Sequence, residues 1–119
     1  MQGTHFTVSY HVPGTLAANE SFIFKVPFDC QLVAVSANGS NANNGILDIG
    51  PSTNTDAAVD GMDVGDSDVP AIYDDKTDFE GDEYYHFVAG TIVEALLDYD
   101  GAGGTAVHDF TLVMFFTEG

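Results

Sequence analysis

One cysteine and four histidines are the residues of this chain best suited to nucleophilic or metal chemistry: Cys30, His5, His11, His86 and His108. A reactive thiolate needs a positive neighbour or a helix N-terminus to lower its pKa. Cys30 instead follows Asp29 and opens an apolar stretch, in a chain with only two Lys and Arg residues. We therefore expect a buried structural thiol rather than a nucleophile, and a single cysteine excludes an internal disulfide.

The four histidines lack the spacing of a zinc site, because none belongs to a His-x-His or His-Glu-x-x-His motif. His5 and His11 fall on the polar face of an alternating segment, so we expect them to face solvent or a contact surface. His108 precedes Asp109 on a predicted strand, where neighbouring side chains point to opposite faces. We predict no catalytic residue, no metal site and no cofactor from this set.

Carboxylates are the other abundant group, and eleven of the nineteen acidic residues lie between Asp56 and Glu83. Calcium binds several oxygen ligands, and two runs of acids offer them: Asp60, Asp63, Asp66 and Asp68, then Asp74, Asp75, Asp78, Glu80 and Asp82. The spacing is not that of an EF-hand, because the segment 66–68 lacks the third acidic position and the glycine that follows it. We favour a solvated acidic loop, with calcium binding as the alternative.

Enzyme motifs are missing from the sequence. Among nineteen acids, carboxylate pairs suited to glycoside hydrolysis arise by chance and carry no specificity. The chain has no Gly-x-Ser-x-Gly motif and no phosphate-binding loop, since the glycine-rich segment 101–104 lacks the lysine and the helix pattern. We predict that the protein is not an enzyme.

Strands must position all of these side chains, because hydrophobic residues recur with a period of two. The predicted strands cover residues 4–12, 21–26, 30–37, 46–49, 71–73, 85–88, 91–99 and 107–117. The strand 30–37 is apolar on both faces from Leu32 to Val35, which is typical of a strand covered on both sides. Residues 51–59 could instead hold one or two helical turns, capped by Ser52 or Thr53.

This pattern predicts an all-β chain with a single domain over residues 1–119. Seven or eight short strands with turns between them favour a β-sandwich or jelly roll. The acidic segment of about 51–83 is expected to be a long exposed loop, and ordered loops of this length are often functional.

The charge balance limits the partners of the chain. Its 119 residues carry a net charge of −17, whereas nucleic-acid binding needs Lys and Arg to replace the counterions of phosphates. The same balance argues against anionic membranes, and no apolar run is long enough to span a bilayer. No secretory signal is visible at the N-terminus. An excess of acidic residues with so little lysine favours a saline habitat, where salt screens the repulsion between carboxylates. The alternative is that the acidic residues keep a densely arrayed surface protein from sticking.

Some apolar residues are left over after one face of each sheet is buried. Val113 and Phe115 in the last strand, and Val93, Leu97 and Tyr99 in the strand before it, add apolar groups to second faces. Such leftover area suggests a partner subunit. The equally weighted alternative is that the acidic loop folds over these faces.

Two segments carry a resemblance to a known class of proteins. Residues 22–37 form a strand, a Pro27-Phe28-Asp29 turn and a second strand before an Asn/Gly loop, and residues 98–116 form a Gly/Ala loop that feeds a terminal strand. Over residues 20–50 and 84–117 the chain resembles the small jelly-roll decoration, or cement, proteins of tailed viruses. The likeness is one of pattern rather than of a diagnostic motif.

The resemblance implies a structural virion protein that binds the outer surface of an icosahedral head and stabilises it. Its partner would be the major capsid protein, and it would form homotrimers at threefold positions. It brings no catalytic residues to this chain. The alternative is a carbohydrate- or receptor-binding β-sandwich of a viral tail or fibre, with the loop 51–83 as a binding surface that could depend on calcium.

Overall fold

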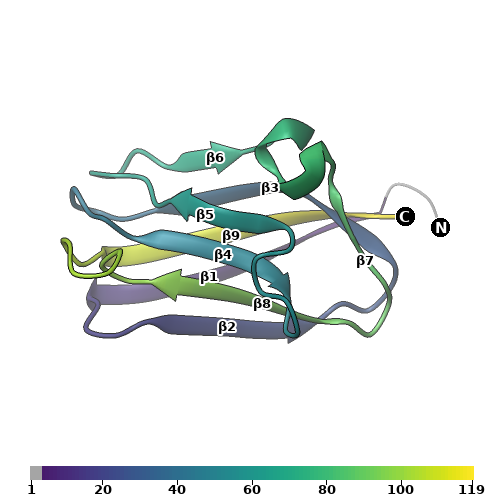
Figure 1. The fold of residues 1–119 in the computed structure, drawn as a ribbon, viewed down its shortest axis with the longest axis horizontal. Helices are drawn as coiled ribbons and strands as arrows, with labels where there is room; N and C mark the ends of the chain where they lie inside the picture. Colours follow the sequence, from purple (N-terminus) through teal and green to yellow (C-terminus); the bar gives the residue numbers. More distant parts are fainter. Residues whose placement is uncertain (1–3) are drawn as a thin grey trace.

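The computed structural model describes residues 4–119 and shows two antiparallel sheets packed face to face (Figure 1). The prediction of an all-β sandwich is confirmed, although residues 4–119 hold nine strands rather than the seven or eight expected. They are β1 (His5–Thr15), β2 (Glu20–Lys25), β3 (Cys30–Asn38), β4 (Ile46–Pro51), β5 (Val59–Asp63), β6 (Ala71–Tyr73), β7 (Tyr85–Phe87), β8 (Ile92–Asp98) and β9 (His108–Glu118). In residues 4–119, no helix is long and apolar enough to cross a membrane.

The strand order is that of a jelly roll. One sheet has the order β1-β9-β3-β6, with β7 also paired to β3, and the other has the order β2-β8-β4-β5. β6 and β7 pair with successive parts of β3, so they act as one interrupted strand. With β6 and β7 counted as one strand, β1 pairs with β9, β2 with β8, β3 with β6 and β7, and β4 with β5. This is the pairing of a long hairpin rolled up into two sheets.

Alternation along the strands builds the core between the two sheets. In β9, Phe110, Leu112, Met114 and Phe116 are all buried. Val93, Ala95 and Leu97 of β8 face them from the opposite sheet and are fully buried. The segment 91–99 is therefore a strand rather than a helix, as its β-branched residues and flanking glycines predict.

A β-bulge explains the apolar run in β3. Leu32 pairs with Phe116 and Ala34 pairs with Phe115, so Val33 is an extra residue in the ladder. The bulge lets Leu32 and Val35 both point into the core, while Val33 and Ala34 are only half-buried on the outside. The expectation that this strand is covered on both sides is therefore wrong: the four apolar residues mark a register shift.

The acidic segment 51–83 is not one long loop. It contains β5, β6 and two short 3₁₀ turns, Lys76–Asp78 and Glu80–Asp82, and it holds turns rather than a helix before β5. Between the two 3₁₀ turns, Phe79 is buried and makes edge contacts with the rings of Tyr73 and Tyr84. The backbone N–H of Glu80 also donates to the carbonyl of Ala58 at 3.0 Å. The segment thus closes the side of the sandwich where β5 and β6 form the sheet edges (Figure 1).

Candidate interaction surface

Cys30 lies in the core at the start of β3 and is fully buried. Burial raises the pKa of the thiol to about 11, and the neighbouring charge of Asp29 adds to the shift. The thiol therefore stays protonated near neutral pH. This confirms the prediction of a buried structural thiol.

The histidines are spread around the molecule instead of converging on one point. His5 and His11 are exposed and point outward from β1, as predicted. The Nδ1 atom of His11 lies 2.9 Å from the Thr111 hydroxyl, and the Nε2 atom of His108 lies 3.2 Å from the Thr15 hydroxyl. Within residues 4–119, no three His, Cys, Asp or Glu side chains are grouped so that they could hold a metal ion.

Asp109 has a structural role that the sequence did not reveal. It has a φ of 50° at a register shift between β1 and β9. One carboxylate oxygen accepts the Gly14 backbone N–H at 2.7 Å, and the other accepts the Ser40 hydroxyl at 2.9 Å. These two hydrogen bonds hold the pKa of the Asp109 carboxyl below its usual value. Asp109 thus ties β1 and the loop after β3 to the start of β9.

The acidic residues proposed as calcium ligands mostly serve the backbone or face solvent. Asp75 and Asp78 cap the same 3₁₀ turn, where Asp75 accepts from Thr77 and Asp78 accepts from the N–H groups of Asp74 and Asp75. The hydrogen bonds from Thr77 keep the pKa of Asp75 below its usual value. These carboxylates are therefore already engaged in local turns.

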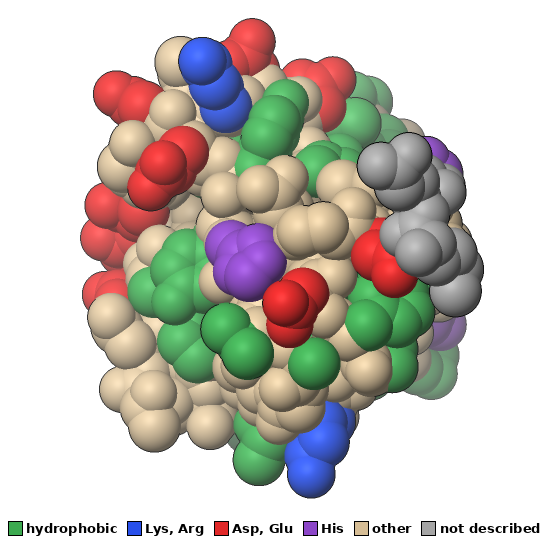
Figure 2. All heavy atoms as spheres, turned by 90° about the vertical axis from the view of Figure 1, so that its right-hand side faces the viewer, with side chains coloured by type: hydrophobic (Ala, Val, Ile, Leu, Met, Phe, Trp, Pro, Cys, Tyr) green, Lys and Arg blue, Asp and Glu red, His purple; other side chains and the backbone are tan. Residues whose placement is uncertain are grey.

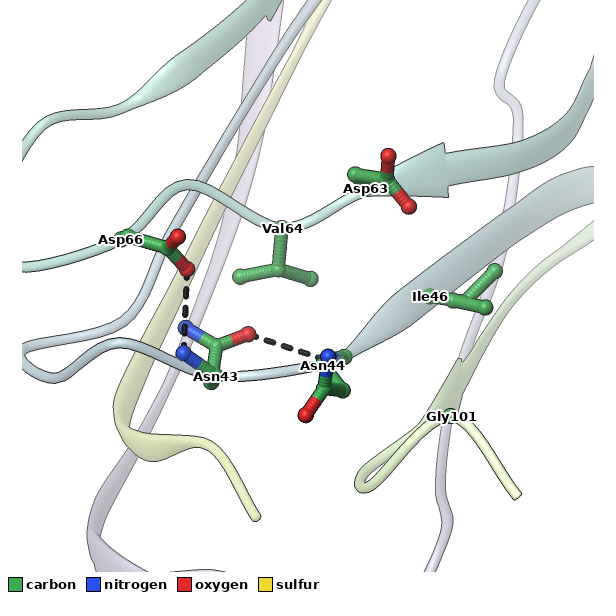
Figure 3. Close-up of a pocket in the computed structure, with 8 residues that line it drawn as sticks. Asn43, Asn44, Ile46, Asp63, Val64, Asp66 and Gly101 are labelled. Carbon is green, nitrogen blue, oxygen red and sulfur yellow. Dashed lines mark hydrogen bonds between the residues drawn. The ribbon is translucent and has the colours of Figure 1, made fainter. Parts of the chain in front are cut away.

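Asp63 and Asp66 border a pocket of about 270 Å³ between the loop before β4 and the segment after β5. They lie on either side of Val64, and the backbone N–H of Asn43 donates to Asp66 at 3.0 Å (Figure 3). The Asn43 side chain accepts from Gly45 and donates to the Gly65 carbonyl, so it holds its own loop in place. The pocket is thus a polar depression. Its two side-chain amides, Asn43 and Asn44, and the carboxylate of Asp66 are already hydrogen-bonded to the chain.

A different feature distinguishes the molecule, namely an outer sheet face that carries one formal charge among the described residues, Asp109 at its end where β9 begins. Strand register places the outward side chains of β1, β9 and β3 in paired rows, so that Thr7, Phe115 and Ala34 lie side by side. We call the whole set the neutral face: His5, Thr7, Ser9 and His11 of β1; Thr111, Val113, Phe115 and Thr117 of β9; Gln31, Ala34, Ser36 and Asn38 of β3; Ile72 of β6; and His86 of β7. None of these residues is Asp, Glu, Lys or Arg.

The outer face of the other sheet is acidic. Register places Asp48, Asp63, Glu94 and Asp98 on it, between the apolar side chains of Ile23, Ile46, Ile92 and Leu96. Partial burial raises the pKa of Asp48, although the Gly61 N–H that donates to it at 2.8 Å has the opposite effect. Repulsion from Asp60, Asp56 and Asp98 raises this pKa further.

The two faces give the molecule a strong charge asymmetry. Figure 2 views the sandwich end on: acidic side chains gather on the left, the side of the β2-β8-β4-β5 sheet, which is nearer the viewer in Figure 1, and along the upper rim, the side where β6 and the 3₁₀ turns lie. On the opposite side, histidine and hydrophobic side chains are more frequent (Figure 2). In a chain with a net charge of −17, the neutral face is where another protein can approach with least electrostatic repulsion and desolvation cost.

These observations define an acidic jelly-roll sandwich with one outer face on which Asp109, at one end, is the charged residue among those described. Among solved structures, its fold is similar to that of a chain in the cyanophage Pam1 capsid asymmetric unit, with a TM-score of 0.59 and 12% sequence identity. The match covers 99% of this chain and 87% of that chain. At this identity, the likeness shows a shared fold. No protein-family model matches the sequence, and no curated protein matches it either.

Proposed function

We propose that the protein is a structural component of a virus particle, a decoration or cement protein that binds the outer surface of an icosahedral head. The observation that carries the proposal is the neutral face, which offers a binding surface for another protein in an otherwise acidic molecule. The shared fold supports it, because the similar chain belongs to a phage capsid unit and the match spans nearly all of both chains. The proposed partner is the major capsid protein.

Binding through the neutral face would stabilise a head by bridging neighbouring capsid subunits. The face presents the half-buried side chains of Val113 and Phe115, flanked by hydroxyl and amide groups that can form hydrogen bonds. Burial of apolar area contributes about 25 cal/mol per Å². The acidic face would then point away from the shell, where its charges stay hydrated. The resemblance implies three copies at each threefold position, and this number stays a prediction.

The test uses heads of the virus that encodes the chain, stripped of this protein, to which purified protein is added back. Phe115→Glu places a carboxylate in the centre of the neutral face, and Thr7→Glu places one on the exposed position paired with it. We expect each variant to bind at least about tenfold more weakly, because an unpaired charge would be buried at the contact. Leu96→Glu is the matched control, since it adds the same charge to the half-buried centre of the acidic face.

Cosedimentation and cryo-electron microscopy of the heads measure the outcome. Equal binding by all variants, or weaker binding by Leu96→Glu alone, would contradict docking through the neutral face. Absence of the chain from purified particles, or its location on tails instead of heads, would overturn the proposed function itself.

A further inference from the structure

One side of the sandwich is open, namely the side where β1 and β2 form the sheet edges. The inward-facing residues of β1, Phe6, Val8, Tyr10 and Val12, pack against the core but stay half-exposed. Their counterparts on the neighbouring strand β9 are fully buried. The rings of Phe6 and Tyr10 contact Phe28 and Phe22, but the apolar row of β1 is less completely covered than the opposite side, where Phe79 is buried.

The backbone of β1 has unpaired groups along the same side. Thr4 pairs with Glu118, whose backbone N–H donates to the Thr4 carbonyl at 2.8 Å. Hydrogen-bonded pairs alternate along an antiparallel ladder, so the even-numbered residues of β1 bond to β9. The backbone N–H and C=O groups of the odd-numbered residues from His5 to His11 therefore point away from β9. Among the described residues, no strand pairs with this edge.

From His5 to Val12, before Pro13 and the register shift that follows it, β1 also lacks the features that normally protect a sheet edge. Such edges are usually short, charged or bulged. β1 is 11 residues long, carries no Asp, Glu, Lys or Arg, and keeps a regular register as far as Val12. The other edge on this side, β2, has 6 residues and carries Glu20 and Lys25.

We propose that β1 pairs antiparallel with β1 of a second copy of this chain, with Ser9 on the twofold axis. Ser9 would then pair with Ser9 of the other copy through two backbone hydrogen bonds, and Thr7 would face His11. On the core side, Val8 would face Tyr10 and Phe6 would face Val12, which gives favourable aromatic and β-branched pairs. The two sheets would join into one, and each copy would cover the apolar row of the other.

A second copy fits this edge for reasons of charge and symmetry. Two chains of net charge −17 repel each other, so they can meet only through an uncharged strip, and β1 is such a strip. An isologous contact needs a self-complementary surface, which the alternating sequence from Phe6 to Val12 supplies. Pairing leaves the neutral face accessible, and a twofold contact of this kind can link copies at neighbouring threefold positions of a head.

Cysteine cross-linking tests the register. In a hydrogen-bonded antiparallel pair the Cα atoms are about 5.5 Å apart, which is within the range of a disulfide. Under mild oxidation, Ser9→Cys is expected to form a covalent dimer about tenfold faster, or more, than Ser21→Cys. Both serines are exposed, point outward and lie on the two edge strands of the open side, and the native Cys30 is fully buried. Thr7→Cys and His11→Cys are expected to cross-link when mixed but not alone.

Proline substitution tests the hydrogen bonding. The backbone N–H of Val26 donates to Thr91, which it pairs with, so the N–H of Ser21 also points away from its partner strand. Ser9→Pro and Ser21→Pro thus each remove one free-edge donor without removing a bond inside a sheet. Sedimentation velocity at 1 M NaCl should show dimers for the native chain and Ser21→Pro, and monomers for Ser9→Pro. A native monomer, an assembly unaffected by Ser9→Pro, or equal cross-linking of the two cysteine variants would overturn the proposal, whatever the result with viral heads.

Discussion

Phe115 and Phe116 are neighbours in the sequence but belong to opposite sides of β9. Phe116 is 1% exposed, and its ring stacks on Phe6 at a centroid distance of 4.8 Å and contacts Phe24 at 5.7 Å. We expect Phe116→Ala to lower the free energy of unfolding by about 3–5 kcal/mol, because it leaves a cavity at the centre of the aromatic core. Phe115→Ala, the matched control on the neutral face, should cost less than about 1 kcal/mol.

Urea denaturation followed by circular dichroism measures both values. Similar losses for the two variants would mean that Phe115 is covered in the free protein and does not lie on an open face.

Single residues show how far sequence reasoning reaches at this scale. The buried state of Cys30 follows from its apolar neighbours, and the exposure of His5 and His11 follows from alternation. Asp109 could not be assigned, because its partners Gly14 and Ser40 come from distant parts of the chain. Hydrogen bonds of this kind depend on the tertiary fold and leave no local pattern.

At the scale of elements, Gly61 controls the shape of β5. Val59 and Met62 are both buried, although they are three positions apart, and Gly61 between them has a φ of 78°. A Cβ atom here would meet open space, with Ile46 Cγ2 at 4.0 Å as its neighbour. We therefore expect Gly61→Ala to cost about 1–2 kcal/mol from backbone conformation alone.

Gly61→Asn serves as the comparison, because asparagine tolerates a positive φ better than alanine does. Thermal unfolding of the two variants gives the order of stability. An alanine variant as stable as the native chain would show that β5 does not need this bulge.

The same irregularity explains which elements could be predicted. β1, β2, β8 and β9 alternate strictly with period two, and their predicted positions agree with the structure to within a few residues. β5 was missed because its bulge spaces the buried residues by three, and the bulge in β3 made a register shift look like a doubly covered strand. The acidic residues around β5 further hid this strand inside an apparent loop, whereas the short extended piece predicted at 71–73 agrees with β6.

At the scale of the whole molecule, the neutral face needs information that alternation does not contain. The polar side of β1 was visible in the sequence, but the pairing of β1 with β9, and of β9 with β3, joins residues between 73 and 112 positions apart. Only this register shows that uncharged side chains of β1, β9 and β3 lie on the same outer face, while acidic side chains lie on the outer face of the other sheet. The leftover apolar residues divide accordingly: Val113 and Phe115 lie on the neutral face, whereas Val93 and Leu97 belong to the core.

The net charge of −17 leads to a prediction for the folded protein as a whole. Folding concentrates like charges, and 1 M salt shortens the Debye length to about 3 Å, from about 10 Å at 0.1 M. We expect the free energy of unfolding to rise by at least about 1 kcal/mol between 0.1 M and 1 M NaCl, because screening relieves this repulsion. Such a rise would support the proposed saline habitat.

A less acidic variant separates screening from other salt effects. Asp56→Asn, Asp60→Asn and Asp68→Asn together remove three charges at exposed positions, and the left-handed backbone at Asp68, with a φ of 65°, accepts asparagine. If repulsion limits stability, the triple variant should be more stable than the native chain at 0.1 M NaCl and should gain less from added salt. A native chain whose stability is unchanged by NaCl but rises with millimolar CaCl₂ would instead point to carboxylates that bind a cation, because specific binding stabilises the folded state by mass action at concentrations too low to screen.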